Sequence, residues 1–326
     1  MSGHPLKFNG DHKIMRIEYH RSLIADTGRL AAFEQALAKV IRKGETVVAD
    51  IGTGSGVLAM IAARLGARKV IAYELAEIGA LAQRLFKLNK LRNIEIIPAR
   101  STEIIEPERA DVVVSETLGN YALEEFLVET MNDAAARHLK PGGVLIPGRL
   151  EQVVAPVTAS RCFDELVAWD RIGRGLDFGP ARRMSLNNAY VRVFPPAELL
   201  QRGRTAVTWD KLDFKVRNRF ARKGTAEWRV EAPVTVFGLA VWWEAELAPG
   251  VTLSTSPLAA PTHWEQLYLP AQEPIELKAG ETLAVQVRSR SSEEGGTDLA
   301  WGLRARTAKG RERVSQDLSL EKGFLP

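Results

Sequence analysis

The sequence predicts an α/β domain with a doubly wound parallel sheet, followed by a mostly antiparallel β domain that carries a helical arm. Three observations lead to this prediction. Short apolar strands alternate with helical stretches over residues 1–148, a glycine-rich turn follows the first strand, and strands dominate after residue 148. A chain of 326 residues has the length of about two domains.

The composition indicates a globular protein, with 45% hydrophobic and 26% charged residues. The first twenty residues contain no apolar core of a secretory signal, and no apolar run is long enough to span a membrane. The single cysteine, Cys162, can form no disulfide within the chain and has no neighbouring zinc ligands. We therefore expect a cytoplasmic protein without a membrane segment or a metal site.

The charge balance gives no support for nucleic-acid binding. Lys and Arg number 44 against 40 Asp and Glu, a formal net charge of +4. One basic cluster could meet an acidic partner, but we interpret it as solvated charges on a strand or loop. Its members are Arg217, Arg219, Arg222 and Lys223. No nucleic-acid partner is predicted.

The first half of the chain follows a repeating strand–helix pattern. Residues 20–43 place apolar side chains at helical spacing, and Gly44 follows as a stop signal. The expected strands are Thr46–Asp50, Lys69–Glu74, Asn93–Ala99 and Asp111–Glu116, with a helix ending near Leu65 and another over Leu123–Leu139. Because these strands are continuously apolar, we expect a parallel sheet covered on both faces.

After Pro147 and Gly148 the pattern changes to β-rich segments between Gly and Pro turns. This pattern predicts an antiparallel barrel or sandwich, and we adopt a β-barrel over residues 149–326. Residues 161–200 are the exception, since they look partly helical and interrupt the strands. We interpret them as a protruding arm inserted in the second domain.

A nucleotide site is expected where the first strand ends. Asp50 is followed by three glycines in alternate positions, Gly52, Gly54 and Gly56. Glycine allows the backbone to approach a ligand, and the following helix offers unpaired N–H groups. A dinucleotide fingerprint would need glycine where Val57 stands, so a ligand without a diphosphate fits better.

Glu74 ends the second predicted strand, where a carboxylate can accept hydrogen bonds from both ribose hydroxyls. The alternative is a solvated carboxylate at the end of a strand. Together with Asp50 and the three glycines, Glu74 resembles the motif of class I S-adenosylmethionine-dependent methyltransferases, which have a Rossmann-like fold. The resemblance implies S-adenosylmethionine as cofactor, with Asp50, Gly52, Gly54, Gly56 and Glu74 binding it.

Two carboxylates, Glu116 and Glu125, flank a turn downstream of this loop. A guanidinium is planar, always charged and offers paired donors that carboxylates bind well. Glu116 and Glu125 are therefore a natural receptor for an arginine side chain. Because Glu124 precedes Glu125, the second carboxylate is identified only to within one position.

Three separated segments resemble the protein arginine methyltransferase family, and the resemblance extends from about residue 19 to the C-terminus. Residues 115–125 look like the double-glutamate loop, and Thr255–Trp264 is similar to the threonine-histidine-tryptophan loop. The N-terminal helix has the spacing of the family's substrate-covering helix, with matching positions at His20, Leu23, Asp26 and Arg29. The order of the segments agrees with the domains described above.

The resemblance implies roles for further residues. Arg29 would bind the methionine carboxylate of the cofactor, and Asp26 with His263 would bridge the N-terminal helix and the barrel. From the chemistry of methyl transfer, the methylated guanidinium must release a proton, and Glu125, or His263 paired with Asp26, could accept it. Without the resemblance, Asp26 and Arg29 are equally compatible with a local ion pair on a helix.

The resemblance also implies contacts outside the catalytic residues. Residues 161–200 would be a dimerisation arm that forms a homodimer. His263 is also compatible with a hydrogen-bonded barrel residue. The position of the family's adenine-contacting acid corresponds to either Thr102 or Glu103 in this sequence, and we adopt Glu103.

One part of the chain departs from the family. The family's aromatic clamp over cofactor and arginine corresponds to Asn9–Met15, which contains no tyrosine.

Taken together, the nucleotide motif and the three family segments predict an S-adenosylmethionine-dependent N-methyltransferase that acts on arginine in proteins or peptides. The alternatives are a methyltransferase of a small guanidino or amino metabolite, and a catalytically idle scaffold that binds the cofactor.

Overall fold

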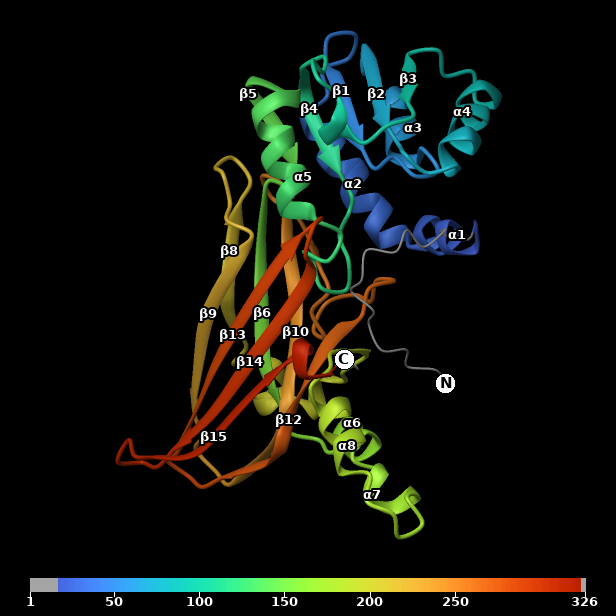
Figure 1. Ribbon diagram of the computed structural model, residues 1–326. Helices are drawn as coiled ribbons and strands as arrows, with labels where there is room; N and C mark the ends of the chain where they lie inside the picture. Colours follow the sequence, from blue (N-terminus) through green and yellow to red (C-terminus); the bar gives the residue numbers. More distant parts are fainter. Residues whose placement is uncertain (1–16, 324–326) are drawn as a thin grey trace.

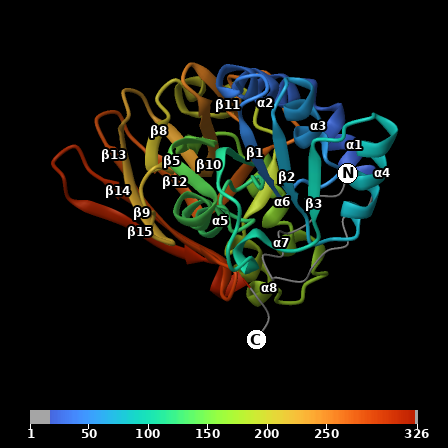
Figure 2. The same cartoon turned by 90° about the horizontal axis from the view of Figure 1, so that it is seen from above.

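The computed structural model describes residues 17–323, which form an α/β region and an antiparallel β region. In Figure 1 the α/β region lies at the top, and the long strands of the β region extend below it. Figure 2, the view from above, shows the blue strands of the first region on one side and the red strands near the end of the chain on the other. The predicted fold class is confirmed.

The first region is built on a five-stranded parallel sheet in the order β3-β2-β1-β4-β5. Its central strand is buried along its whole length and is apolar except for Asp50, as expected for a sheet covered on both faces. The strands are β1 (Val47–Ile51), β2 (Lys69–Tyr73), β3 (Ile94–Ile97), β4 (Ala110–Ser115) and β5 (Leu139–Ile146).

Two helices precede the sheet, and further helices connect its strands. They are α1 (Ile17–Ala25), α2 (Thr27–Val40), α3 (Val57–Arg64), α4 (Ile78–Leu88) and α5 (Leu127–Asp133), with a 3-10 turn η1 (Ser101–Glu103) and a π-turn η2 (Ala134–His138). The helix expected from Leu123 begins at Leu127, because the preceding residues form a loop. That loop carries both candidate carboxylates.

The strand order reverses between β1 and β4, and this reversal decides where a ligand can bind. β2 and β3 lie on one side of β1, whereas β4 and β5 lie on the other. The loops that leave β1 and β4 therefore diverge and leave a crevice at the carboxyl ends of the strands. Gly52 to Gly56 follow β1, and Glu116 follows β4.

The second region contains two antiparallel sheets. One has the order β7-β12-β10-β6-β8, with β11 paired to β10, and the other has the order β15-β14-β13-β9. β8 lies beside β9 and β12 beside β15, so the sheets face a shared apolar core that includes Trp243 and Trp301. The antiparallel domain is confirmed, and its strands hydrogen-bond as two sheets.

These strands are longer than those of the parallel sheet. They are β6 (Arg149–Val157), β7 (Tyr190–Arg192), β8 (Val207–Asp213), β9 (Ala221–Arg229), β10 (Val234–Ala248), β11 (Val251–Ser254), β12 (Gln266–Leu277), β13 (Thr282–Ser292), β14 (Gly296–Arg306) and β15 (Glu312–Ser319). Short 3-10 turns occur at η3 (Pro196–Glu198), η4 (Leu200–Gly203) and η5 (Leu320–Gly323).

The helical arm expected after residue 161 is present as three short helices. They are α6 (Arg161–Leu166), α7 (Trp169–Ile172) and α8 (Gly179–Leu186). Figure 1 shows them projecting from the β region at the end away from the parallel sheet. Within residues 17–323, no helix has the length and apolar character needed to cross a membrane.

Candidate functional site

The glycine loop after β1 adopts a backbone that requires glycine. Gly52, Gly54 and Gly56 have φ values of 73°, 56° and 83°. A Cβ at Gly56 would lie 2.4 Å from Phe86, so a side chain there would collide with α4. The loop consequently turns sharply into α3 and exposes backbone to the crevice.

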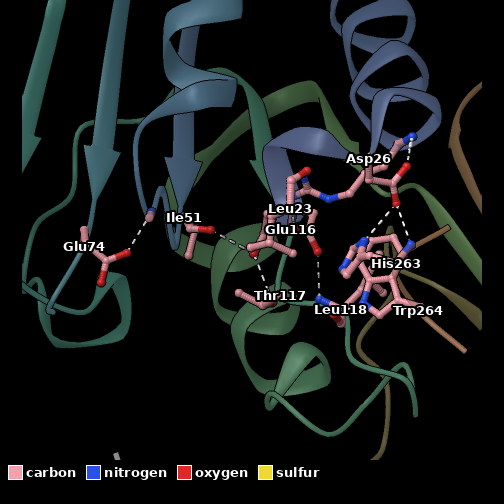
Figure 3. A network of polar contacts seen from close by, with 12 residues as sticks. Leu23, Asp26, Ile51, Glu74, Glu116, Thr117, Leu118, His263 and Trp264 are labelled. Carbon is pink, nitrogen blue, oxygen red and sulfur yellow. Dashed lines mark hydrogen bonds and ion pairs between the residues drawn. The ribbon is translucent and has the colours of Figure 1, made fainter. Parts of the chain in front are cut away.

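Glu74 fixes the glycine loop from the end of β2. Its carboxylate accepts hydrogen bonds from the Gly54 N–H at 2.8 Å and from the Ala76 N–H at 2.8 Å. Figure 3 shows Glu74 beside the loop, with its carboxylate turned toward the loop's backbone. Each carboxylate oxygen keeps a further lone pair for a ligand hydroxyl.

Asp50 lies at the base of the same crevice and is 1% exposed. It accepts a hydrogen bond from the Thr53 hydroxyl at 2.6 Å. Burial raises the pKa of Asp50 to about 7, although the bond from Thr53 opposes the rise. Asp50 therefore changes charge near neutral pH.

Side chains of the β region hold the double-glutamate loop between β4 and α5. Trp243 Nε1 donates to the Gly119 carbonyl at 2.9 Å, and Trp264 Nε1 donates to the Leu118 carbonyl at 2.9 Å. The Tyr121 hydroxyl hydrogen-bonds the Ser289 hydroxyl at 2.6 Å. The β region thus sets the position of a loop that belongs to the α/β region.

The structure separates the two adjacent candidates for the second carboxylate. Glu124 is turned back onto its own loop and accepts a hydrogen bond from the Asn120 N–H at 3.1 Å. Glu125 lines the same cavity as Glu116, and its exposed surface faces that cavity. Glu125 is consequently the partner of Glu116 in the site.

Both carboxylates are harder to ionise than a free glutamate. Burial raises the pKa of Glu116, with the neighbouring Arg29 opposing the rise. Burial raises the pKa of Glu125 to about 8, and the charges of Glu116 and Glu124 add to the rise. Desolvation is the larger cause of the rise at Glu125, ahead of the repulsion from Glu116.

Arg29, in the first turn of α2, is paired with Glu116 rather than exposed to solvent. Arg29 Nη2 donates to Glu116 Oε2, and Arg29 Nη1 donates to the Leu23 carbonyl at 3.1 Å. The guanidinium also lies 5.8 Å from the ring centre of Trp264. Arg29 still lines the cavity, where it can face a ligand carboxylate.

Asp26 and His263 are in contact and lie behind the cavity wall. One oxygen of Asp26 caps α2 by accepting from the Arg29 N–H at 2.9 Å. The other accepts from the backbone N–H of His263 at 2.8 Å and lies 2.9 Å from His263 Nδ1. Figure 3 shows Asp26 between α2 and the His263–Trp264 segment. The contact joins the N-terminal helix to the β region.

The protonation of this pair follows from its surroundings. Burial lowers the pKa of His263, although Asp26 opposes the change. For Asp26, burial acts to raise the pKa, but the bonds from Arg29 and His263 outweigh it and leave the pKa lowered. A neutral His263 therefore donates from Nδ1 to an ionised Asp26. Its Nε2 is buried and hydrogen-bonds no other residue of the described chain.

The central cavity has a volume of about 960 Å³ and brings most of the expected residues together. Its wall includes Arg29, Asp50, Gly52, Gly54, Glu74, Glu116 and Glu125. A second cavity of about 230 Å³ shares Gly52 and Glu74 with it. An elongated ligand with a cationic centre and a ribose fits this arrangement, so the residues suit S-adenosylmethionine.

Four expected residues lie off this cavity. Asp26 and His263 are not part of its wall, and Gly56 shapes the loop behind it. Glu103 is exposed and lines neither cavity, whereas the alternative, Thr102, lines the smaller one. The clamp segment Asn9–Met15 lies outside the described residues.

The sequence reasoning missed Tyr19 and named His20 only for its spacing on the covering helix. His20 is buried over the glycine loop, with its ring 3.3 Å from the position of a Cβ on Gly54. Tyr19 lines the cavity, and burial, followed by the charges of Glu125 and Glu116, raises its pKa to about 12. Tyr19 could have been identified from the sequence, because it immediately precedes His20 on the helix that the resemblance assigns to cover the substrate.

The site contains no cluster suited to a metal. Across residues 17–323, no group of three or more His, Cys, Asp and Glu side chains could hold a metal ion. Three carboxylates have other partners instead, since Glu74 accepts from backbone N–H groups, Glu116 pairs with Arg29 and Asp26 pairs with His263.

Two family models match the chain. Residues 30–159 match ribosomal protein L11 methyltransferase (PrmA), and residues 153–304 match the arginine methyltransferase oligomerization subdomain. The two matches meet at the junction between the parallel sheet and the antiparallel strands. They correspond to the two regions described above.

Individual relatives match over most of the chain. Arginine N(omega)-methyltransferase from Streptomyces achromogenes subsp. streptozoticus is 31% identical, over 82% of this chain and 75% of its own length. Protein arginine N-methyltransferase 6 from Xenopus tropicalis is 30% identical, over 80% of each chain.

The fold is shared with a solved complex, the Trypanosoma brucei PRMT1 enzyme–prozyme heterotetramer with AdoHcy. The TM-score is 0.83 at 25% identity, covering 94% of this chain and 98% of that one. Sequence and fold thus agree with the geometry of the crevice. The chain belongs to the protein arginine methyltransferase family and is an S-adenosylmethionine-dependent N-methyltransferase.

Proposed function

We propose that the protein methylates a guanidinium nitrogen of arginine in a protein or peptide. The observation that carries the proposal is that Glu116 and Glu125 line one cavity beside the glycine loop and Glu74. Two carboxylates bind a planar cation with paired donors. A fixed pair of this kind is expensive to maintain without a cation to bind.

The residues of the site have distinct roles in the reaction. S-adenosylmethionine supplies a methyl group on a sulfonium, and the bond from carbon to sulfur breaks as the bond to nitrogen forms. Glu116 and Glu125 hold the guanidinium so that one nitrogen faces the methyl group, and they draw positive charge toward the other nitrogens. Arg29, Asp50 and Glu74 hold the cofactor.

Glu125 is our candidate for the proton acceptor. The methylated guanidinium must release one proton, and Glu125 has a pKa of about 8, near the pH at which a base works best. Asp26 and His263 lie behind the cavity wall, so we propose that they position Arg29 and the start of α2. Gly56 acts through the shape of the loop.

The nature of the acceptor has a specific competitor. The relative from Streptomyces is named for arginine and not for a protein, which favours a small guanidino metabolite as the second candidate. Incubation with methyl-labelled cofactor and a cell lysate, followed by mass spectrometry, distinguishes the two. Label on arginine within peptides supports the proposal, whereas label confined to small molecules supports the competitor.

We further propose that the protein forms a homodimer through the arm at residues 161–200. Four large apolar side chains of the arm are exposed, Ile172, Leu176, Phe178 and Val193. The match of residues 153–304 to an oligomerization subdomain supports this proposal. Light scattering on Leu176→Asp tests it, since a monomer is expected from the variant and a dimer from the unchanged protein.

Two broader expectations accompany this function. We keep 1–148 and 149–326 as the proposed domains, because the parallel sheet ends with β5 and the antiparallel strands start with β6. We also keep a cytoplasmic location as a proposal, which the unpaired, buried Cys162 supports.

A further inference from the structure

The smaller cavity lies at one end of the cofactor site. It shares Gly52, Glu74 and Arg100 with the central cavity, whereas Arg29, Glu116 and Glu125 line only the central one. If Glu74 binds the ribose and the methyl group lies near Glu116, the base must extend beyond Glu74 in the opposite direction. The smaller cavity is therefore the place for the adenine.

Adenine carries an exocyclic amine that needs a hydrogen-bond acceptor when it is buried. Glu103, the acid expected from the sequence, is absent from the wall of this cavity. The carboxylates in the wall are Glu74, Glu129 and Glu293. Since Glu74 is assigned to the ribose, Glu129 and Glu293 are left to accept from the base.

Glu293 comes from the β region, in the turn between β13 and β14, and is held against the cavity from two sides. Its backbone N–H donates to Glu129 Oε2 at 3.1 Å. Its carboxylate forms an ion pair with Arg100, which lines both cavities. Figure 1 shows the upper ends of β13 and β14 beside α5, the helix that carries Glu129.

The turn itself is also fixed. Ser291 Oγ donates to the Leu123 carbonyl in the double-glutamate loop, and the Gly295 N–H donates to Ser292 Oγ at 3.2 Å. Because one oxygen of the Glu129 carboxylate already accepts the Glu293 N–H, Glu129 is suited to hold the turn. We therefore assign the ligand to Glu293, whose carboxylate pairs with Arg100 and keeps further lone pairs free.

We propose that Glu293 binds the exocyclic amine of the adenine of S-adenosylmethionine, with Arg100 and Glu129 positioning it. The second region thereby completes the cofactor site, and base recognition depends on a residue nearly 200 positions beyond Glu103 in the chain. The proposal rests on S-adenosylmethionine as cofactor and is independent of the identity of the methyl acceptor.

Calorimetric titration of the full chain tests this proposal without any methyl acceptor. The ligands are S-adenosylhomocysteine and S-inosylhomocysteine, in which an oxygen replaces the amine of the base. Because a carboxylate accepts from the amine and repels the oxygen, we expect the unchanged protein to prefer the adenine ligand by about tenfold or more. In Glu293→Gln this preference should vanish or invert, since a carboxamide can also donate to the oxygen.

Matched variants separate recognition from structure. Glu294→Gln changes the neighbouring residue of the same exposed turn, and Glu103→Gln removes the acid expected from the sequence. Both should retain the preference of the unchanged protein. Glu129→Gln should also retain it, because the amide oxygen still accepts from the Glu293 N–H.

Three results would overturn the proposal. One is an unchanged protein that binds the two ligands equally. Another is a Glu293→Gln variant that keeps the preference or weakens both ligands by the same factor. The third is loss of the preference in Glu129→Gln or Glu103→Gln instead. A failure of arginine methylation leaves this titration unaffected, so the two ideas are tested separately.

Discussion

Arg29 and Glu116 form an ion pair in which the two side chains are only 4% and 7% exposed. The pair joins the first turn of α2 to the end of β4, although the residues are 87 positions apart. Breaking a buried pair by removing one partner costs about 3–5 kcal/mol, because a charge is left uncompensated. Glu116 thus already binds one guanidinium of the protein, beside the position proposed for the substrate's.

Glu116→Gln should abolish turnover while leaving cofactor binding nearly intact. The amide still accepts a hydrogen bond from Arg29, but it no longer stabilises positive charge on the acceptor. Loss of one such electrostatic contact lowers kcat by about 100-fold or more. Steady-state kinetics and calorimetry with S-adenosylhomocysteine measure the two effects. Glu103→Gln is the matched control, and full activity in Glu116→Gln would refute the role of Glu116.

The pH dependence should report the ionisation of Glu125. With a pKa of about 8, Glu125 is mostly protonated at pH 7 and cannot accept a proton. As pH rises toward 8 the carboxylate forms, so kcat/KM should increase about tenfold per pH unit and level off above 8. The measurement is a profile of kcat/KM from about pH 6 to about pH 9.5. This range extends more than about one pKa unit to either side of the expected midpoint.

In Glu125→Gln the rise of kcat/KM with pH should disappear, because an amide does not titrate. Most of the activity should be lost as well. If the rise persists unchanged in the variant, another group causes it. Asp50 is then the group to test, since its pKa is raised to about 7.

Glu74→Ala should weaken cofactor binding more than it slows the bound enzyme. The variant loses the acceptor for the ribose and the bond that holds Gly54 in the loop. Loss of hydrogen bonds to a charged group corresponds to a dissociation constant about 10–100-fold higher. Calorimetry with S-adenosylhomocysteine measures it, with Glu77→Ala, a neighbouring cavity residue, as control. Unchanged affinity would contradict the assignment.

Asp26→Ala should destabilise the fold through the start of α2. The variant loses the helix cap and both contacts with His263. Loss of the cap alone costs about 1–2 kcal/mol in the free energy of unfolding. Asp26→Asn should lose less, since its side-chain oxygen can still cap the helix. Urea unfolding measures both, and Glu34→Ala, exposed on the same helix, serves as control.

The same variants separate positioning from proton transfer. If Asp26 acts through Arg29, Asp26→Ala should weaken cofactor binding as well as activity. A variant with normal stability and normal cofactor affinity but no turnover would contradict the positioning role and favour direct catalysis by Asp26 with His263.

Tyr19→Ala should raise the KM for the guanidino acceptor. Tyr19 lines the cavity beside both carboxylates, and its raised pKa keeps the ring neutral and able to contact a cation. An aromatic contact with a guanidinium accounts for a change in KM of up to about tenfold. The KM of Tyr19→Phe should stay near that of the unchanged protein. Equal losses in the alanine and phenylalanine variants would indicate that the hydroxyl, not the ring, matters.

The sequence identified the parts of the site that local patterns encode. A glycine turn between a strand and a helix can be recognised because the strand period, the turn chemistry and the helix start adjoin one another. Glu74 and Glu116 could be found because each ends a predicted strand, and the ends of parallel strands meet at one edge of a sheet. The alternation of elements also gave the fold class of both regions.

The tertiary structure decided between candidates that adjoin in the sequence. Glu125 faces the cavity whereas Glu124 folds back on its loop, because side chains of the β region hold Leu118, Gly119 and Tyr121. Likewise Thr102 lines the smaller cavity and Glu103 does not. Spacing alone carries no information about which way a loop side chain turns.

What the sequence by itself determined is therefore the fold class, the glycine loop and the strand-end carboxylates, since each depends on residues close together in the chain. Only the tertiary structure decided that Arg29 pairs with Glu116 and that Glu293 reaches the cofactor end of the crevice. These contacts join residues 87 and more positions apart. The first contact joins α2 to the end of β4 within the α/β region, and the second forms where the β region packs against it. Such packing depends on the whole fold and not on any local pattern.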